Sequence, residues 1–182
     1  MARSKKKSKT KAKKPAKVSK RTSSFDGALR QELSALFEKS HAHVSLKQAL
    51  AGVPAEIRGV TPVGAPYSLW QLLEHLRIAQ WDILEYSRNP KHVSPDFPEG
   101  YWPRVPAPAN PADWDKTVDA FRRGTNAMIE LISDPRKDLF AKLPPANEQS
   151  LLREALVLAD HNAYHIAQIV DLRRALGSWT EG

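Results

Sequence analysis

Two histidines, His161 and His165, lie four residues apart in a segment whose hydrophobic pattern predicts a helix. On an α-helix this spacing places both imidazoles on one face, about one turn apart, where they could share a metal ion. His75 occupies a comparable flank of another predicted helix, so a third ring nitrogen could reach the same point. Three neutral imidazoles leave a position open for water, whose pKa a bound ion can lower to about 7. By spacing alone, each histidine could equally be a hydrogen-bonded residue in a groove between helices.

Cysteine is absent from the chain, so a metal would have to be bound by imidazole or carboxylate groups. A bound ion could still receive a thiolate from a small-molecule thiol. His41 and His43 are two residues apart and cannot both face inward on a straight helix; either could line the site, and otherwise we expect them at the surface. We expect His92 to be exposed to solvent, whereas Tyr101 and Trp102 could cover the metal cleft from a long connection.

Hydrophobic residues at three-and-four spacing predict four long helices that would position these side chains. The clearest start is Ser68, because Gln71 stands three residues later and completes a capping box. The first helix could be irregular near residues 40–43. The predicted helices cover residues 25 to about 50, residue 68 to just before Asn89, about 112–133, and about 148–176.

The connection between the second and third predicted helices is rich in proline. Between Pro90 and Pro111 the prolines are Pro95, Pro98, Pro103, Pro106 and Pro108, which are too many for a regular element. A connection of this length lets two consecutive helices run parallel. We therefore expect an all-α fold, a four-helix bundle of up-down-down-up type with a long crossover between helices 2 and 3.

The positive charge of the chain is concentrated at its N-terminus. The net charge is +8, and residues 1–24 contain 11 Lys and Arg residues and no acidic residue, so residues 25–182 carry a net charge of −3. With almost nothing apolar to bury, residues 1–24 are expected to form a disordered basic tail. Such a tail can make weak, non-specific contacts with nucleic acid; a solvated tail without a specific partner is the alternative.

The remaining residues, 25–182, are enough for one domain with its own core. No run of about 18 apolar residues occurs, and the charged start is not followed by the apolar segment of a secretory signal. We therefore expect a cytoplasmic protein that does not enter a membrane.

Two segments resemble a known family. Residues 160–170 (DHNAYHIAQIV) are similar to the last helix of the DinB/YfiT-like family, and residues 69–76 (LWQLLEHL) resemble its second-helix histidine motif. The resemblance covers residues 25–182 and implies a four-helix bundle in which His75, His161 and His165 bind a divalent transition metal: nickel, zinc or manganese. Ala167 departs from the pattern, because many members have glycine there, but one added methyl removes no ligand.

The same resemblance implies a metal-dependent enzyme that acts on a small-molecule substrate. Transfer of a low-molecular-weight thiol, as in S-transferases, is our first expectation, and hydrolysis by activated water is the second. The alternative is a non-catalytic, stress-induced helical binding protein whose basic N-terminal arm associates with nucleic acid. A helical bundle with five tryptophans could also form a homodimer.

Overall fold

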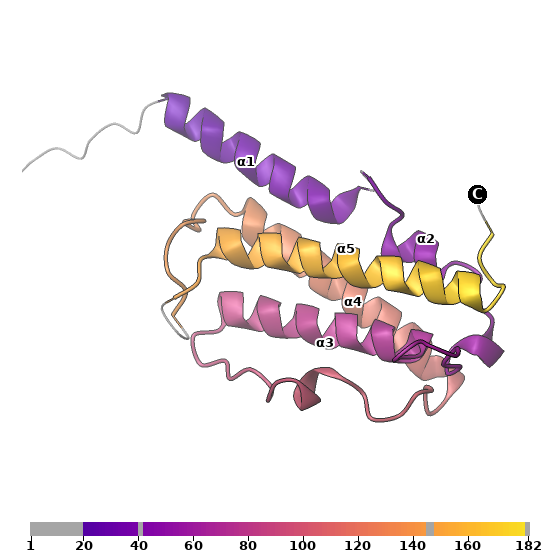
Figure 1. The fold of residues 1–182 in the computed structure, drawn as a ribbon. Coiled ribbons are helices and arrows are strands. Elements are labelled where there is room, and N and C mark those ends of the chain that lie inside the picture. Colours follow the sequence, from indigo (N-terminus) through magenta and orange to yellow (C-terminus); the bar gives the residue numbers. More distant parts are fainter. Residues whose placement is uncertain (1–19, 40–41, 145–147, 181–182) are drawn as a thin grey trace, which may run out of the picture.

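The computed structural model describes residues 20–39, 42–144 and 148–180, and the regular elements within these ranges are helices (Figure 1). The α-helices are α1 (Lys20–Glu38), α2 (Leu46–Leu50), α3 (Leu69–Arg88), α4 (Pro111–Ser133) and α5 (Leu151–Ala175), and short 3-10 helices span Ala55–Ile57 and Glu99–Tyr101. The predicted all-α fold is confirmed. Across the described ranges, none of these helices is both long and apolar enough to cross a bilayer.

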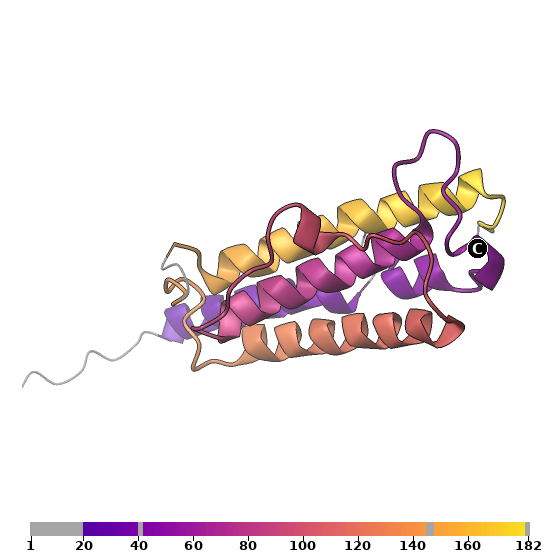
Figure 2. The same ribbon diagram turned by 90° about the horizontal axis from the view of Figure 1, so that it is seen from below.

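The four long helices lie side by side, with α3 packed against both α4 and α5 (Figures 1 and 2). α3 and α4 run in the same direction, because Glu74 bonds to Thr117 and the later residue Gln80 bonds to Phe121. α5 runs opposite to α3, so its C-terminal end lies beside the start of α3 (Figure 1). The connection of residues 89–110 returns along α3 (Figure 2) and can therefore contact its side chains.

The predicted first helix is divided in two. We expected one helix from residue 25 to about residue 50, but α1 ends at Glu38 and α2 begins only at Leu46. The second start has its own capping box, in which Ser45 accepts from the Gln48 backbone and the Gln48 side chain accepts from the Ser45 backbone. At the other end, α1 begins at Lys20, five residues before the expected domain boundary. Residues 1–19 lie outside the described residues.

The other helix ends agree with the local sequence. α3 begins at the predicted capping box of Ser68 and Gln71 and ends at Arg88. At the start of α5, the Ser150 side chain accepts a hydrogen bond from the Arg153 backbone. These caps satisfy N–H groups that a helix start otherwise leaves without partners. They therefore fix the residue at which α3 and α5 each begin, and with it the direction in which each later side chain of the helix points.

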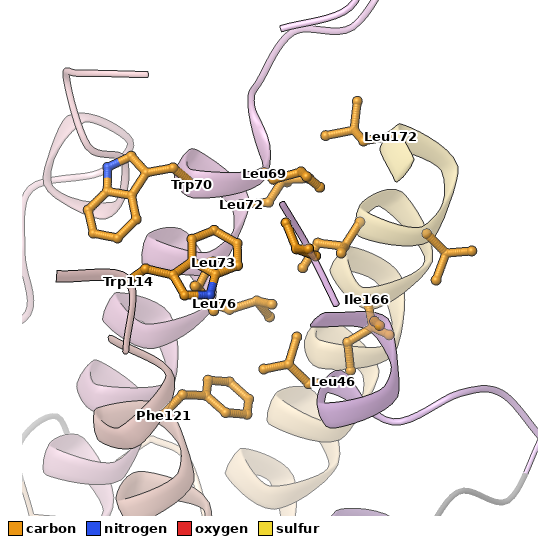
Figure 3. Close-up of a cluster of buried hydrophobic side chains, with 14 residues drawn as sticks. Leu46, Leu69, Trp70, Leu72, Leu73, Leu76, Trp114, Phe121, Ile166 and Leu172 are labelled. Carbon is orange, nitrogen blue, oxygen red and sulfur yellow. The ribbon is translucent and has the colours of Figure 1, made fainter. Parts of the chain in front are cut away.

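A cluster of buried hydrophobic side chains joins the first half of α3 to α2, α4 and α5 (Figure 3). From α3 it contains Leu69, Leu72, Leu73 and Leu76, each at most 2% exposed. Full burial of each leucine contributes about 1.5–3 kcal/mol, so this cluster holds α3 in a fixed register against α2, α4 and α5. A second cluster fills the opposite half of the bundle around Met128 and Leu158.

Arg173 is buried on α5, where a charged side chain needs partners. Because Arg173 falls on the apolar side of the last predicted helix, the sequence predicts an ion pair with a residue such as Asp82 or Glu85, and this prediction is wrong. The guanidinium instead donates to the backbone carbonyls of Ala49 at 2.8 Å and Ser178 at 2.7 Å. Arg173 thus ties α2 and the C-terminal segment to α5.

Candidate metal centre

α3 and α5 bring three histidines together across the groove between them. His75 lies two turns into α3, and His161 and His165 lie one turn apart on α5. The Nε2 atom of His75 is 3.1 Å from Nε2 of His165 and 3.0 Å from Nε2 of His161. The three side chains each offer a ring nitrogen within 4.8 Å of the others, which makes this group one that could hold a metal ion.

The other ring nitrogens of His75 and His165 face oxygen acceptors. His75 Nδ1 lies 2.9 Å from the backbone carbonyl of Tyr101, and His165 Nδ1 lies 2.7 Å from Oε1 of Gln168. A carbonyl oxygen only accepts, so Nδ1 carries the proton in both rings. In a neutral imidazole the Nε2 atom then bears a lone pair. Two lone pairs therefore face each other at the centre of the site, and a cation placed there would be stabilised by both.

The spacing of the nitrogens also suits a transition metal. Two imidazole nitrogens bound to one ion at about 2.0–2.1 Å would be about 2.9–3.4 Å apart, for angles between octahedral and tetrahedral. The two measured Nε2 separations, 3.0 and 3.1 Å, fall in this range. The donor set and its spacing thus fit a divalent ion such as nickel, zinc or manganese.

Burial keeps the three imidazoles neutral, as metal ligands must be. Loss of hydration lowers the pKa of His75 from 6.5 to about 4, against the opposing effect of the Tyr101 carbonyl. Loss of hydration, followed by the neighbouring histidines, lowers the pKa of His161 to about 4 as well. The pKa of His165 is lowered for the same first reason. At neutral pH the site is therefore ready to bind a cation without first losing protons.

Aromatic rings from two connections cover His75. The Trp102 ring stacks on the His75 imidazole with centroids 3.8 Å apart and planes 2° apart. Tyr67 stacks on the other face of Trp102, also at 3.8 Å. The expectation that aromatic residues of this connection cover the site holds for the Trp102 ring, whereas Tyr101 contacts His75 through its backbone carbonyl and directs its side chain to Asp82. This cover limits the access of water to one side of His75.

Two of the remaining histidines, His43 and His92, lie apart from the three. His43 is exposed and its Nδ1 contacts the backbone carbonyl of Val44, so it does not line the site. His41 lies outside the described residues. The prediction that His92 is exposed is wrong: its side chain is 6% exposed, and Nε2 lies 2.7 Å from Oδ1 of Asp82. The cause is the crossover, which folds onto α3 and buries this ring.

Residues next to the ligands in sequence have other roles. Glu74 accepts hydrogen bonds from Arg77 and Thr117, so its carboxylate is engaged away from the centre. Tyr164 is 63% exposed and touches the site only through the edge of the His165 ring, at 5.0 Å between centroids. Gln168, three residues beyond His165 on α5, accepts a hydrogen bond from Nδ1 of that ring, a role that the spacing of the histidines does not indicate. Within the part of the chain that the structure describes, the candidate ligands are therefore the three imidazoles.

Fold and site together define a class of protein, a helical bundle with a centre of three histidines. A family model described as DinB superfamily matches residues 29–169, well over half of the chain and including all three histidines. The chain belongs to the DinB superfamily. The comparison with curated proteins gave no match, and the comparison with solved structures gave none either.

Proposed function

We propose that this chain is a divalent-metal-dependent enzyme in which His75, His161 and His165 hold the ion. The observation that carries the proposal is the convergence of three Nε2 atoms. Two of them direct a lone pair at the centre, because the Nδ1–H groups of the same rings donate to the Tyr101 carbonyl and to Gln168. Two acceptors facing each other at 3.1 Å in a buried groove repel, unless a cation lies between them. A purely structural pair of histidines would instead place a donor opposite an acceptor.

The composition of the site favours chemistry over storage of the metal. A bound ion would act as a Lewis acid that lowers the pKa of a water or thiol in its remaining position. Neutral imidazoles do not reduce the ion's charge, as carboxylate ligands would, and the nearest acid along α3, Glu74, is engaged by Arg77. The chain's own residues would hold the ligand rings in place, and the Trp102 ring would keep water from one side.

The reaction we propose first is transfer of a low-molecular-weight thiol to a small electrophilic substrate. The chain contains no cysteine, so the sulfur nucleophile would come from a second small molecule. Metal-activated hydrolysis is the second proposal and uses the same site with water as the nucleophile. Both reactions need a neutral ligand set that is preformed at physiological pH, which the low pKa values of His75 and His161 support.

An activity assay tests the proposal. Protein loaded with nickel, zinc or manganese would be incubated with a panel of low-molecular-weight thiols and small electrophiles, and loss of free thiol would be measured. Parallel reactions without thiol, on ester and amide substrates, would report hydrolysis.

We expect turnover that a chelator abolishes and that His161→Ala abolishes. His43→Ala is the matched control, because it removes an exposed histidine that does not line the site. Turnover that survives chelation, or that His161→Ala leaves intact, would contradict a metal-dependent reaction at this centre.

The basic segment supports a separate proposal about partners. Eleven Lys and Arg residues within residues 1–24 would give weak, salt-sensitive affinity for nucleic acid. This property would also serve the alternative function, a stress-induced binding protein tethered by its arm. Deletion of residues 1–19, which leaves α1 complete, should abolish DNA binding at low salt and leave metal content unchanged. Full-length protein that shows no affinity for DNA at low salt would contradict the tether.

A further inference from the structure

A buried carboxylate lies on α3 two turns beyond His75. Asp82 is 7% exposed, and its side chain faces the crossover of residues 89–110. One oxygen lies 2.7 Å from Nε2 of His92, and the other accepts from the hydroxyl of Tyr101 at 2.6 Å. A buried carboxylate is costly unless hydrogen-bonded, so Asp82 needs both of its crossover partners.

Tyr101 is therefore attached to α3 at two places. Its hydroxyl donates to Asp82, and its backbone carbonyl accepts from Nδ1 of His75. Burial, and then the Asp82 carboxylate, raise the pKa of Tyr101 to about 12, so the hydroxyl is a donor throughout the neutral range. The backbone carbonyl that meets His75 belongs to the same residue, so its position depends on where the Tyr101 ring is held.

We propose that Asp82 is a positioning residue for the metal centre, acting through Tyr101 to keep the proton of His75 on Nδ1 and the lone pair on Nε2. His92 is the second anchor, because it holds the opposite oxygen of the same carboxylate. The inference rests on the proposed role of His75 as a ligand. It assigns to the crossover a part in preparing the site, beyond connecting α3 to α4.

The geometry favours this role over simple attachment of a loop. The crossover has other attachments to α3, including the hydrogen bond from Gln71 to the carbonyl of Pro103 and the stacking of Trp102 on His75. These contacts hold the crossover near α3. Among these attachments, the Asp82 contact is the one that ties the ring of Tyr101, whose carbonyl meets His75, to α3 itself. The other contacts of Tyr101, with Phe97 and Pro98, lie within the crossover, so Asp82 sets the direction of that carbonyl relative to α3.

The test uses Tyr101→Phe in the full-length protein, which removes one hydroxyl and leaves the ring in place. Tyr86→Phe is the matched control, because the Tyr86 hydroxyl is buried on the same helix and has no hydrogen-bond partner among the described residues. Asp82→Asn is a second variant, because it replaces one of the two carboxylate oxygens, which contact His92 and Tyr101, by an NH2 group that cannot accept.

The first measurement is the tautomer of His75, read from nitrogen chemical shifts in long-range proton–nitrogen NMR spectra of metal-free protein at neutral pH. We expect the Nδ1–H form in the wild type and in Tyr86→Phe, and a mixture of both tautomers in Tyr101→Phe and Asp82→Asn. The second is affinity for Ni²⁺ by calorimetry, which we expect to fall up to about 10-fold in Tyr101→Phe. This is the lower end of the effect of losing a direct partner of a histidine ligand, because the carbonyl partner of His75 remains and loses only its anchor.

Tyr101→Phe with the wild-type tautomer and wild-type nickel affinity would overturn the inference, even if the variant unfolds at a lower temperature. Absence of nickel binding to the wild type would instead contradict the proposed function. The two failures are distinguishable, because the tautomer is measured without metal.

Discussion

Acidification should destabilise the metal-free protein through its central histidines. In the folded chain the pKa of His75 and of His161 is about 4, whereas both titrate near 6.5 when solvated. A folded pKa below the unfolded pKa means that the unfolded chain binds protons first as the pH falls. The stability that these groups contribute is complete above pH 6.5 and is lost as the pH falls from about 6.5 towards about 4.

The size of this effect follows from the two pKa values. Between pH 7 and pH 5 the shifts correspond to at most about 2 kcal/mol for each histidine. Solvent screens an imidazole that is only partly buried, so we expect roughly 1 kcal/mol for each, and roughly 2 kcal/mol for the pair. This loss is a large part of the stability of an ordinary domain.

Urea denaturation of chelator-treated protein at pH 7, 6 and 5 would measure the loss. His161→Asn is the comparison, because carboxylates titrate alike in both proteins and cancel in the difference. We expect the variant to lose roughly 1 kcal/mol less than the wild type over this range. Equal losses in the two proteins would show that His161 is hydrated in the folded state, and would refute the burial on which its pKa depends.

Three further predictions concern the stability of the helical bundle and its increase on metal binding. Arg30 donates to the carbonyls at the end of α4, including that of Ile132 at 2.6 Å, so Arg30→Met should lower the free energy of unfolding by about 3 kcal/mol in urea denaturation without changing nickel affinity. Gly124→Ala would place a methyl 2.6 Å from Nε2 of Gln80. Thermal melts should show a net loss of about 1–2 kcal/mol, since the clash exceeds the roughly 1 kcal/mol that alanine adds to a helix. Free metal at about 100 times its Kd should stabilise the chain by about 2.7 kcal/mol in the same melts, and a chelator should reverse this gain. An unchanged free energy of unfolding in Arg30→Met would contradict the first prediction, and a more stable Gly124→Ala would contradict the second. A melting temperature that does not change when metal is added would contradict the third.

Local signals in the sequence predicted what depends on neighbouring residues. Ser68 and Gln71 mark the start of α3, and the four-residue spacing of His161 and His165 places both on one face of α5. The break between α1 and α2 was also encoded locally, since Ser45 and Gln48 have the spacing of the capping box at Ser68. The apolar residues of α1 and α2 keep the same three-and-four spacing across the break, so this spacing alone predicts one continuous helix.

The contacts of the crossover could not be predicted in the same way. A proline-rich segment has no period that indicates which side chains face inward, so nothing local placed His92 against Asp82. The acceptor for His75 is the backbone carbonyl of Tyr101, a group that every residue carries, and residue types give no sign of it. Both contacts form only when chain segments 10 to 26 residues apart are brought together.

Metal content per chain is the most direct test of whether His75, His161 and His165 bind one ion together. Purified protein equilibrated with nickel, then freed of excess metal, would be measured by elemental analysis beside His161→Ala and His43→Ala. We predict one ion per chain in the wild type and in His43→Ala, and little or none in His161→Ala. Equal metal content in all three proteins would contradict a centre built from His75, His161 and His165.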